Sequence, residues 1–188
     1  MIGHSKAQAS ENLDLAVMPT RRFPNNPFLG RWDAFYFFDP DRLFERAFPD
    51  TMRALLACGN GSSVCMRNLD GTPFADPQEG ASLCLDGSTS GEVYWKYLRG
   101  SGPGFGWLSC MDRYACGSDS GHWSIYCERN NEMAVIALRE NSARFGSALE
   151  RLRAMPIRRA FESSDMYGFY SLPEAWRQEL LRAFAPKE

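Results

Sequence analysis

Residues 123–138 read WSIYCERNNEMAVIAL, and this stretch decides the fold. In its first half, apolar Trp123, Ile125 and Cys127 alternate with residues whose side chains can form hydrogen bonds. A period of two is typical of a β-strand with one face in the core and one face in water. We therefore expect residues 123–128 to be such a strand.

The second half of this stretch predicts a neighbouring strand. Asn130 and Asn131 tolerate a positive φ, so they can form the tight turn between the two strands. Residues 133–138 are apolar at every position, which predicts a central strand buried on both faces. Farther along, Phe145, Leu149 and Leu152 recur at helical spacing, so we expect a helix over residues 142–154, capped by Asn141, to pack on this sheet.

Shorter patterns predict the remaining elements. Aromatic or alternating runs favour strands, whereas apolar residues spaced i, i+3, i+4 between capping residues favour helices. We expect further strands at residues 33–38, 92–98 and 105–110, and helices at 39–48 (capped by Asp39 and ended by Pro49), 52–60, and 171–184, the last opened by a capping box of Ser171 and Glu174. The order of elements predicts an α+β fold, a central antiparallel sheet with flanking helices.

The chain shows no internal repeat or linker. Residues 29–188 are therefore expected to form a single domain, a usual size for one core. Residues 1–28 show little periodicity and end in RRFPNNP, whose prolines and asparagines oppose regular structure. We expect these residues to form an extended or flexible arm.

Composition excludes several classes of function. The formal net charge of −2 offers no overall positive field, which disfavours nucleic-acid binding. No apolar run approaches the ~20 residues that cross a bilayer, and the first residues lack the apolar stretch of a signal peptide. We expect a cytoplasmic protein whose six cysteines are free thiols.

The motifs that resemble catalytic or ligand-binding sites are incomplete. The Gly-rich run at residues 100–106 leads into an expected strand, so it lacks the helix N-terminus of a phosphate site. Ser120 lies in a run that ends at His122, but no sequence context marks a catalytic serine and its base. The cysteines contain no C-x2-C pair for zinc. We expect no catalytic residue, no metal and no cofactor.

Charge is distributed unevenly along the chain. Residues 68–95 contain no lysine or arginine but five acids, namely Asp70, Asp76, Glu79, Asp86 and Glu92. The arginines of residues 144–159 are expected to form a solvated helix face. An exposed segment of one charge sign indicates a surface that steers a basic partner towards it.

Residues 92–148 carry a family resemblance. They contain Val93-Tyr94-Trp95, a Gly-rich loop, residues 121–126, the apolar run at 133–138 and a helix. This order resembles the small α+β immunity proteins that bacteria make against their own secreted polymorphic toxins. The resemblance implies tight stoichiometric binding of a cognate toxin, encoded in an adjacent gene, and occlusion of the toxin's active site. The contact residues expected on this basis are Asp70, Asp76, Glu79, Asp86, Glu92, Tyr94 and Trp95.

Two alternatives remain open at this point. One is a non-catalytic subunit or adaptor with no toxin partner. The other is an enzyme whose site is assembled from dispersed side chains, namely Cys110, Cys116, His122, Asp112 and Asp119.

Overall fold

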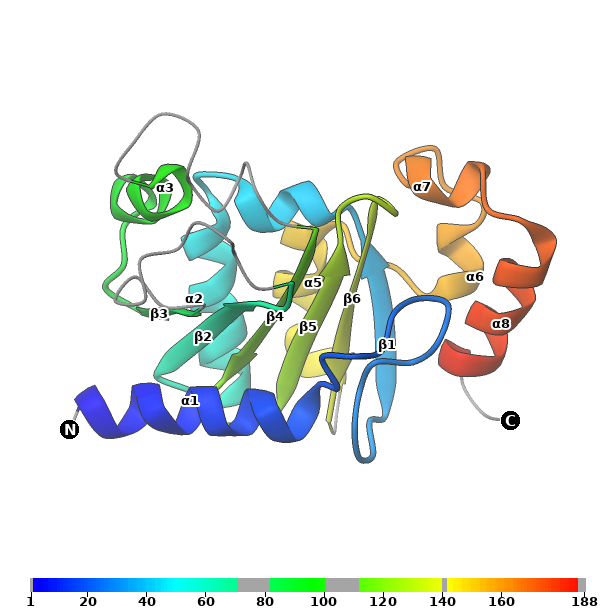
Figure 1. The fold of residues 1–188 in the computed structure, drawn as a ribbon. Coiled ribbons are helices and arrows are strands. Elements are labelled where there is room, and N and C mark those ends of the chain that lie inside the picture. The colour runs from blue at the N-terminus through cyan, green and yellow to red at the C-terminus, as the bar shows by residue number, and fades with distance from the viewer. Residues whose placement is uncertain (1, 71–81, 101–111, 140–141, 186–188) are drawn as a thin grey trace.

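The computed structural model describes residues 2–70, 82–100, 112–139 and 142–185, and it gives the chain a single-domain α+β fold (Figure 1). A six-stranded antiparallel sheet in the order β1-β6-β5-β4-β2-β3 forms its centre. The strands are β1 (Ala34–Phe38), β2 (Ser63–Asn68), β3 (Ser82–Asp86), β4 (Arg113–Ser118), β5 (Trp123–Glu128) and β6 (Met133–Leu138). The predicted fold class is confirmed.

The pair of strands that opens the sequence argument is present in the expected register. Residue Trp123 of β5 lies opposite Leu138 of β6, and Glu128 lies opposite Met133. All six residues of β6 are buried, as predicted for a strand with core on both sides. The turn itself differs from the prediction, because the positive φ of 49° falls on Glu132 and not on either asparagine.

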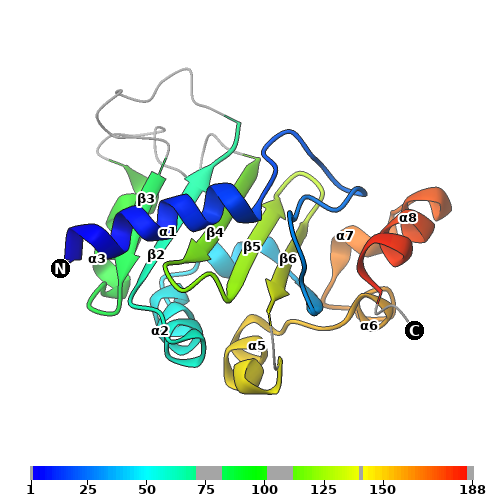
Figure 2. The same cartoon turned by 90° about the horizontal axis from the view of Figure 1, so that it is seen from below.

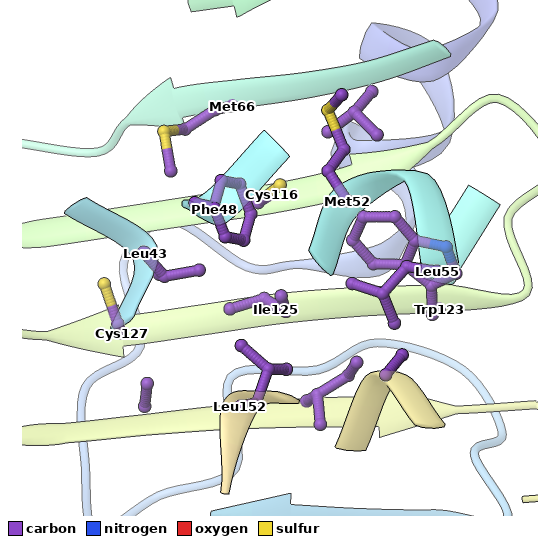
Figure 3. Close-up of a cluster of buried hydrophobic side chains, with 14 of the residues drawn as sticks. Leu43, Phe48, Met52, Leu55, Met66, Cys116, Trp123, Ile125, Cys127 and Leu152 are labelled. Carbon is purple, nitrogen blue, oxygen red and sulfur yellow. The ribbon is translucent and has the colours of Figure 1, made fainter. Parts of the chain in front are cut away.

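Helices α2 (Phe48–Gly59), α3 (Gly91–Arg99) and α5 (Gly146–Leu152) cover one side of the sheet, which we call the first face. The short 3-10 helices η1 (Pro40–Phe44) and η2 (Ser142–Phe145) complete this layer. Figure 3 shows Met52 and Leu55 of α2, with Leu152 of α5, packed over Trp123 and Ile125 of β5. The helix predicted over residues 142–154 therefore forms in the expected place, as η2 followed by α5; its predicted cap, Asn141, lies outside the described residues.

The opposite side, which we call the second face, is covered by α1 (Ile2–Ala16), residues 17–28, and the C-terminal helices α6 (Ile157–Ala160), α7 (Tyr167–Tyr170) and α8 (Glu174–Phe184). Figure 2 shows α1 across the sheet, on the side away from α2 and α5. The predicted extended or flexible arm is therefore wrong for residues 2–16. Ala9, Leu13 and Ala16 recur at helical spacing and are buried against β2 and β4, so the helix gains a core face.

The predicted wet face of β5 is also wrong, because all six of its residues are buried. Tyr126 and Glu128 on this face form hydrogen bonds within the protein instead of with water. The carboxylate of Glu128 accepts hydrogen bonds from the Tyr126 hydroxyl (2.5 Å), from the Phe23 amide (2.9 Å) and from the Asn131 side chain. The covering segment is thus attached to the sheet through a buried acid.

Residues 92–98 form most of α3 and not the strand that was predicted. The Ser90 hydroxyl caps the helix by accepting from the Val93 amide (3.2 Å), and Tyr94 and Leu98, spaced i, i+4, are buried. The strand predicted at residues 105–110 lies outside the described residues.

Several other boundaries also differ from the predictions. Pro49 lies in the first turn of α2 and does not end a helix, although Asp39 caps η1 as expected. The capping box of Ser171 and Glu174 does not form, since α8 begins after Pro173 with no side-chain cap. Among the described helices, none is long and apolar enough to cross a membrane.

Candidate functional site

The surface is hollowed at the end of the sheet where β1 and β5 finish and β4 and β6 begin. This groove has a volume of about 690 Å³. Four segments that are distant in sequence supply its walls: the start of η1, the residue before β4, the β5–β6 turn and the start of α7. We call it the acidic groove, and the charged residues that line it are Asp39, Asp41, Asp112, Arg129, Glu132 and Asp165.

Local structure fixes two of these carboxylates. The Asp39 side chain accepts the Asp41 amide at 2.9 Å, because Asp39 is the cap of η1. The Asp112 side chain accepts the Asn130 amide at 2.8 Å and so holds the β5–β6 turn. These two acids are structural supports of the groove as well as part of its charge.

Two other carboxylates of the groove are largely in solvent. The side chains of Asp41 and Asp165 are 73% and 58% exposed, with only long ion pairs, to Arg129 (3.8 Å) and Arg153 (4.0 Å) respectively. The lining carries five carboxylates and one guanidinium, that of Arg129, while Arg22 pairs with Asp112 at 3.4 Å and Arg153 with Asp165. The remaining excess of acids favours a cationic group. Their exposure means that a partner could reach them without unfolding the protein.

Two exposed tyrosines lie on α7, at the side of the groove. Tyr167, which lines the groove, is 77% exposed and Tyr170 is 55% exposed, and their rings meet edge to face at 6.5 Å. Both are among the most exposed large apolar side chains of the described residues. Tyrosine combines apolar area with a polar tip and has few torsions to order, so it is a frequent anchor at protein interfaces.

The contact between α7 and the β5–β6 turn is unusually close. A Cβ atom placed on Gly168 would lie 2.9 Å from the Glu132 Cβ and would collide with the Asn131 carbonyl oxygen. Glycine is therefore required here, and it seats α7 directly on the turn (Figure 1).

A second depression of about 620 Å³ shares Asp41 and Arg129 with the acidic groove. Trp95 lines it, with the guanidinium groups of Arg99 and Arg46 at 4.9 Å and 6.0 Å from its ring centre. The structure therefore brings Trp95, an expected contact residue, next to the acidic groove.

Asp70, the first acid of the predicted contact segment, has a structural position. Its carboxylate accepts the Arg113 amide (2.7 Å) and Nε (2.6 Å), and Arg113 also donates to the Pro19 carbonyl (2.7 Å). Burial acts to raise the pKa of Asp70, but the hydrogen bonds and charge of Arg113 outweigh it and lower that pKa. Asp70 thus joins β2, β4 and the N-terminal segment.

The other predicted contact residues have different surroundings. Asp86 accepts hydrogen bonds from the amide and hydroxyl of Ser88, which lower its pKa, so it stabilises a turn. Glu92 is exposed and pairs with Arg46 at 2.8 Å. Tyr94 is completely buried and donates to the Leu43 carbonyl, so it cannot contact a partner in this conformation. Asp76 and Glu79 lie outside the described residues.

The dispersed catalytic site is not assembled among the described residues. Burial raises the pKa of Cys116 well above its usual value, the opposite of what an attacking thiolate requires. His122 contacts the Gly59 carbonyl through Nδ1 at 2.7 Å. Asp112 and Asp119 flank opposite ends of β4, roughly 20 Å apart, so they do not form a carboxylate pair. Cys110 lies outside the described residues.

Candidate metal ligands and the Gly-rich run can be compared with the structure only in part. Within residues 2–70, 82–100, 112–139 and 142–185, no three His, Cys, Asp or Glu side chains are grouped to hold a metal ion. Gly100 ends α3 with a φ of 67°, and the rest of the Gly-rich run lies outside those ranges.

No family model, no curated protein and no solved structure matches this chain. The function therefore has to be inferred from the chain's own surface.

Sequence reasoning missed most of the acidic groove. Asp41, Glu132, Asp165 and Tyr167 were not singled out, because each is ordinary in its own segment. One signal was available: Asp39 and Glu132 stand directly beside predicted strands, and antiparallel neighbours bring such ends together.

Proposed function

We propose that this protein neutralises a cognate bacterial toxin by binding it stoichiometrically and covering its active site, without catalysis of its own, in the cytoplasm of the cell that makes the toxin. The observation that carries the proposal is the acidic groove with the exposed tyrosines of α7 beside it. We propose this groove as the interface, in place of the acids of residues 70–92.

Charge and shape together favour a basic protein as the partner. A patch of one sign accelerates encounter with the opposite sign, and complementary charges suppress wrong partners. Tyr167 offers an exposed aromatic anchor next to the charges, which a bound partner would desolvate, and Trp95, with Arg46 and Arg99 over its ring, lines the adjoining depression. A toxin that acts on nucleic acid or another polyanion needs a basic cleft, which this arrangement fits.

The first test is co-expression with the product of the adjacent gene. We expect that product to arrest growth alone, this protein to restore growth, and the two to co-elute as a one-to-one complex. A harmless or unbound neighbour would refute the toxin proposal. Binding without toxicity would instead favour the adaptor alternative, and substrate turnover by the purified chain would favour the enzyme.

A matched pair of charge reversals tests the interface. Asp41→Arg with Asp165→Arg changes two exposed groove carboxylates, and Glu11→Arg with Glu179→Arg makes the same change on α1 and α8. We expect the groove variant to raise the Kd more than tenfold and the control to change it less than twofold. Equal melting temperatures of both variants would exclude misfolding. An equal loss of binding in the two variants would contradict the groove as the interface.

A further inference from the structure

Two cysteines face each other across the strand pair at one edge of the sheet. Cys65 of β2 lies directly opposite Cys84 of β3 in the antiparallel register. Directly opposed residues have Cα atoms about 4.5–5.5 Å apart, which lies inside the range of about 4.4–6.8 Å found in disulfides. The backbone therefore already provides the separation that a disulfide needs.

The two side chains also point to the same side. Cys65 belongs to the buried cluster of the second face, and Cys84 packs against that cluster. Cys116 and Cys127 belong to the first-face cluster, and their strand partners are Met66, Ile125, Tyr114 and Ala134. Among the described strands, Cys65 and Cys84 are the cysteines that the register pairs.

The surroundings of the two thiols differ. Cys65 is fully buried, whereas Cys84 is partly exposed, on a strand whose outer edge pairs with no described strand. Burial, and next the neighbouring Cys84, raise the pKa of Cys65 to about 11. We therefore expect a small oxidant to react first at Cys84. The raised pKa of Cys65 slows its own attack on the product, but its position directly opposite Cys84 makes that attack intramolecular.

We propose that Cys65 and Cys84 are a redox modification site, at which a small disulfide such as oxidised glutathione cross-links β2 to β3. The Cys84 thiolate attacks one sulfur of the oxidant, forms a mixed disulfide and releases one glutathione thiolate. The Cys65 thiol then gives its proton to the released glutathione thiolate and attacks the Cys84 sulfur, which expels the second glutathione thiolate to take up a proton from water. Two protein thiols are oxidised to one disulfide, and one oxidised glutathione is reduced to two thiols.

The cross-link would stabilise the edge of the sheet. It closes the chain between residues 65 and 84 into a covalent loop, which restricts the unfolded state more than the folded one. For a loop of this length in a chain of this size, we expect oxidation to raise the melting temperature by roughly 5–10 °C. The inference is independent of the acidic groove and of the proposed toxin partner.

Peptide mapping of the folded, full-length protein tests the site. The protein is incubated with oxidised glutathione, alkylated without reductant, digested, and the disulfide-linked peptides are identified by mass spectrometry. We expect Cys65–Cys84 as the dominant pair, together with the rise in melting temperature, both reversed by dithiothreitol. A stable mixed disulfide on Cys84 with Cys65 still alkylated, or a dominant pair such as Cys84 with Cys110, would overturn the proposal.

Two variants distinguish oxidation of the Cys65–Cys84 pair from a general effect of oxidising any cysteine. Cys84→Ser should abolish both the cross-linked peptide and the stabilisation, and this partly exposed position tolerates serine. Cys58→Ser, also partly buried but on α2, should leave both unchanged. Retention of the oxidant-induced stabilisation in Cys84→Ser would refute the assignment even if the peptide were missed.

Discussion

The two faces of the sheet are covered in different ways. The first face is almost entirely apolar, with α2, α3 and α5 packed over Trp123, Ile125 and their neighbours. The second face also has an apolar cluster, but it carries Arg113 and Glu128, the buried charged residues of the described chain. Hydrophobic burial is not directional, whereas a hydrogen bond to a charge is, so the two faces are specified by different physics.

The polar contacts of the second face direct the path of the N-terminal segment. Glu128 accepts the Phe23 amide, and Arg113 donates to the Pro19 carbonyl. Asn12 of α1 donates to the Asp119 carbonyl at 2.7 Å, and Ser5 donates to the Asp119 carboxylate at 2.5 Å. The N-terminal segment, whose helix α1 is only weakly amphipathic, is thus held on the sheet by specific hydrogen bonds as well as by apolar burial.

The largest loss of stability is expected on the first face, where apolar burial is the main stabilising interaction. Leu55→Ala on the first face removes a fully buried side chain and should lower the free energy of unfolding by about 2–5 kcal/mol. Leu15→Ala on α1, at 71% exposure, makes the same chemical change and should stay within about 0.5 kcal/mol. Urea unfolding followed by circular dichroism measures both. Similar losses in the two variants would mean that the first face is not the main core.

A smaller effect is expected at the buried acid of the second face. In Glu128→Gln the new amide group would meet the donors of Phe23, Tyr126 and Asn131, so we expect a loss of about 1–3 kcal/mol. Glu179→Gln, whose side chain is 50% exposed, should change the free energy of unfolding by less than about 0.5 kcal/mol. If Glu128→Gln unfolds at the wild-type urea concentration, the polar contacts do not specify this face.

The smallest expected loss of stability concerns Asp70 and depends on pH. Because the folded-state pKa of Asp70 lies below its ordinary value, its stabilisation is present above the ordinary pKa and is lost as the pH falls through the folded value. Asp70→Asn should therefore be less stable than wild type at pH 7, by about 1 kcal/mol, and the two should converge as the pH falls below the folded-state pKa of Asp70. Thermal melts across this range would show the convergence. A gap that persists at low pH would mean that the charge of Asp70 is not what matters.

The same contrast explains which parts of the fold were predictable. Strands β5 and β6 were found because their apolar pattern extends through a complete hairpin, and β6 carries core residues on both sides. The strand predicted at residues 92–98 was a helix because aromatic residues suit either structure, while the decisive signals were the Ser90 cap and the spacing of Tyr94 and Leu98. Helix α1 was missed because alanines supply much of its buried face.

The candidate site was less predictable than the fold. The acidic segment at residues 70–92 is evident in the sequence. In the structure, however, the carboxylates of Asp70 and Asp86 accept hydrogen bonds from Arg113 and Ser88. The acidic groove instead collects acids from segments that only the strand order brings together. The charge of one segment can be read from the sequence. The charge of a surface patch depends on which segments the tertiary structure brings together.

The seating of Gly168 on the β5–β6 turn has a consequence for recognition. Since α7 has no room to move closer to Asn131 and Glu132, the close contact at Gly168 sets the position of the backbone from which Tyr167 and Tyr170 project. Preorganised anchors spare an association the entropy of ordering a loop, so more of the contact energy appears as affinity. At this surface, the absence of a side chain at Gly168 thus sets how closely the helix that carries both tyrosines lies against the β5–β6 turn.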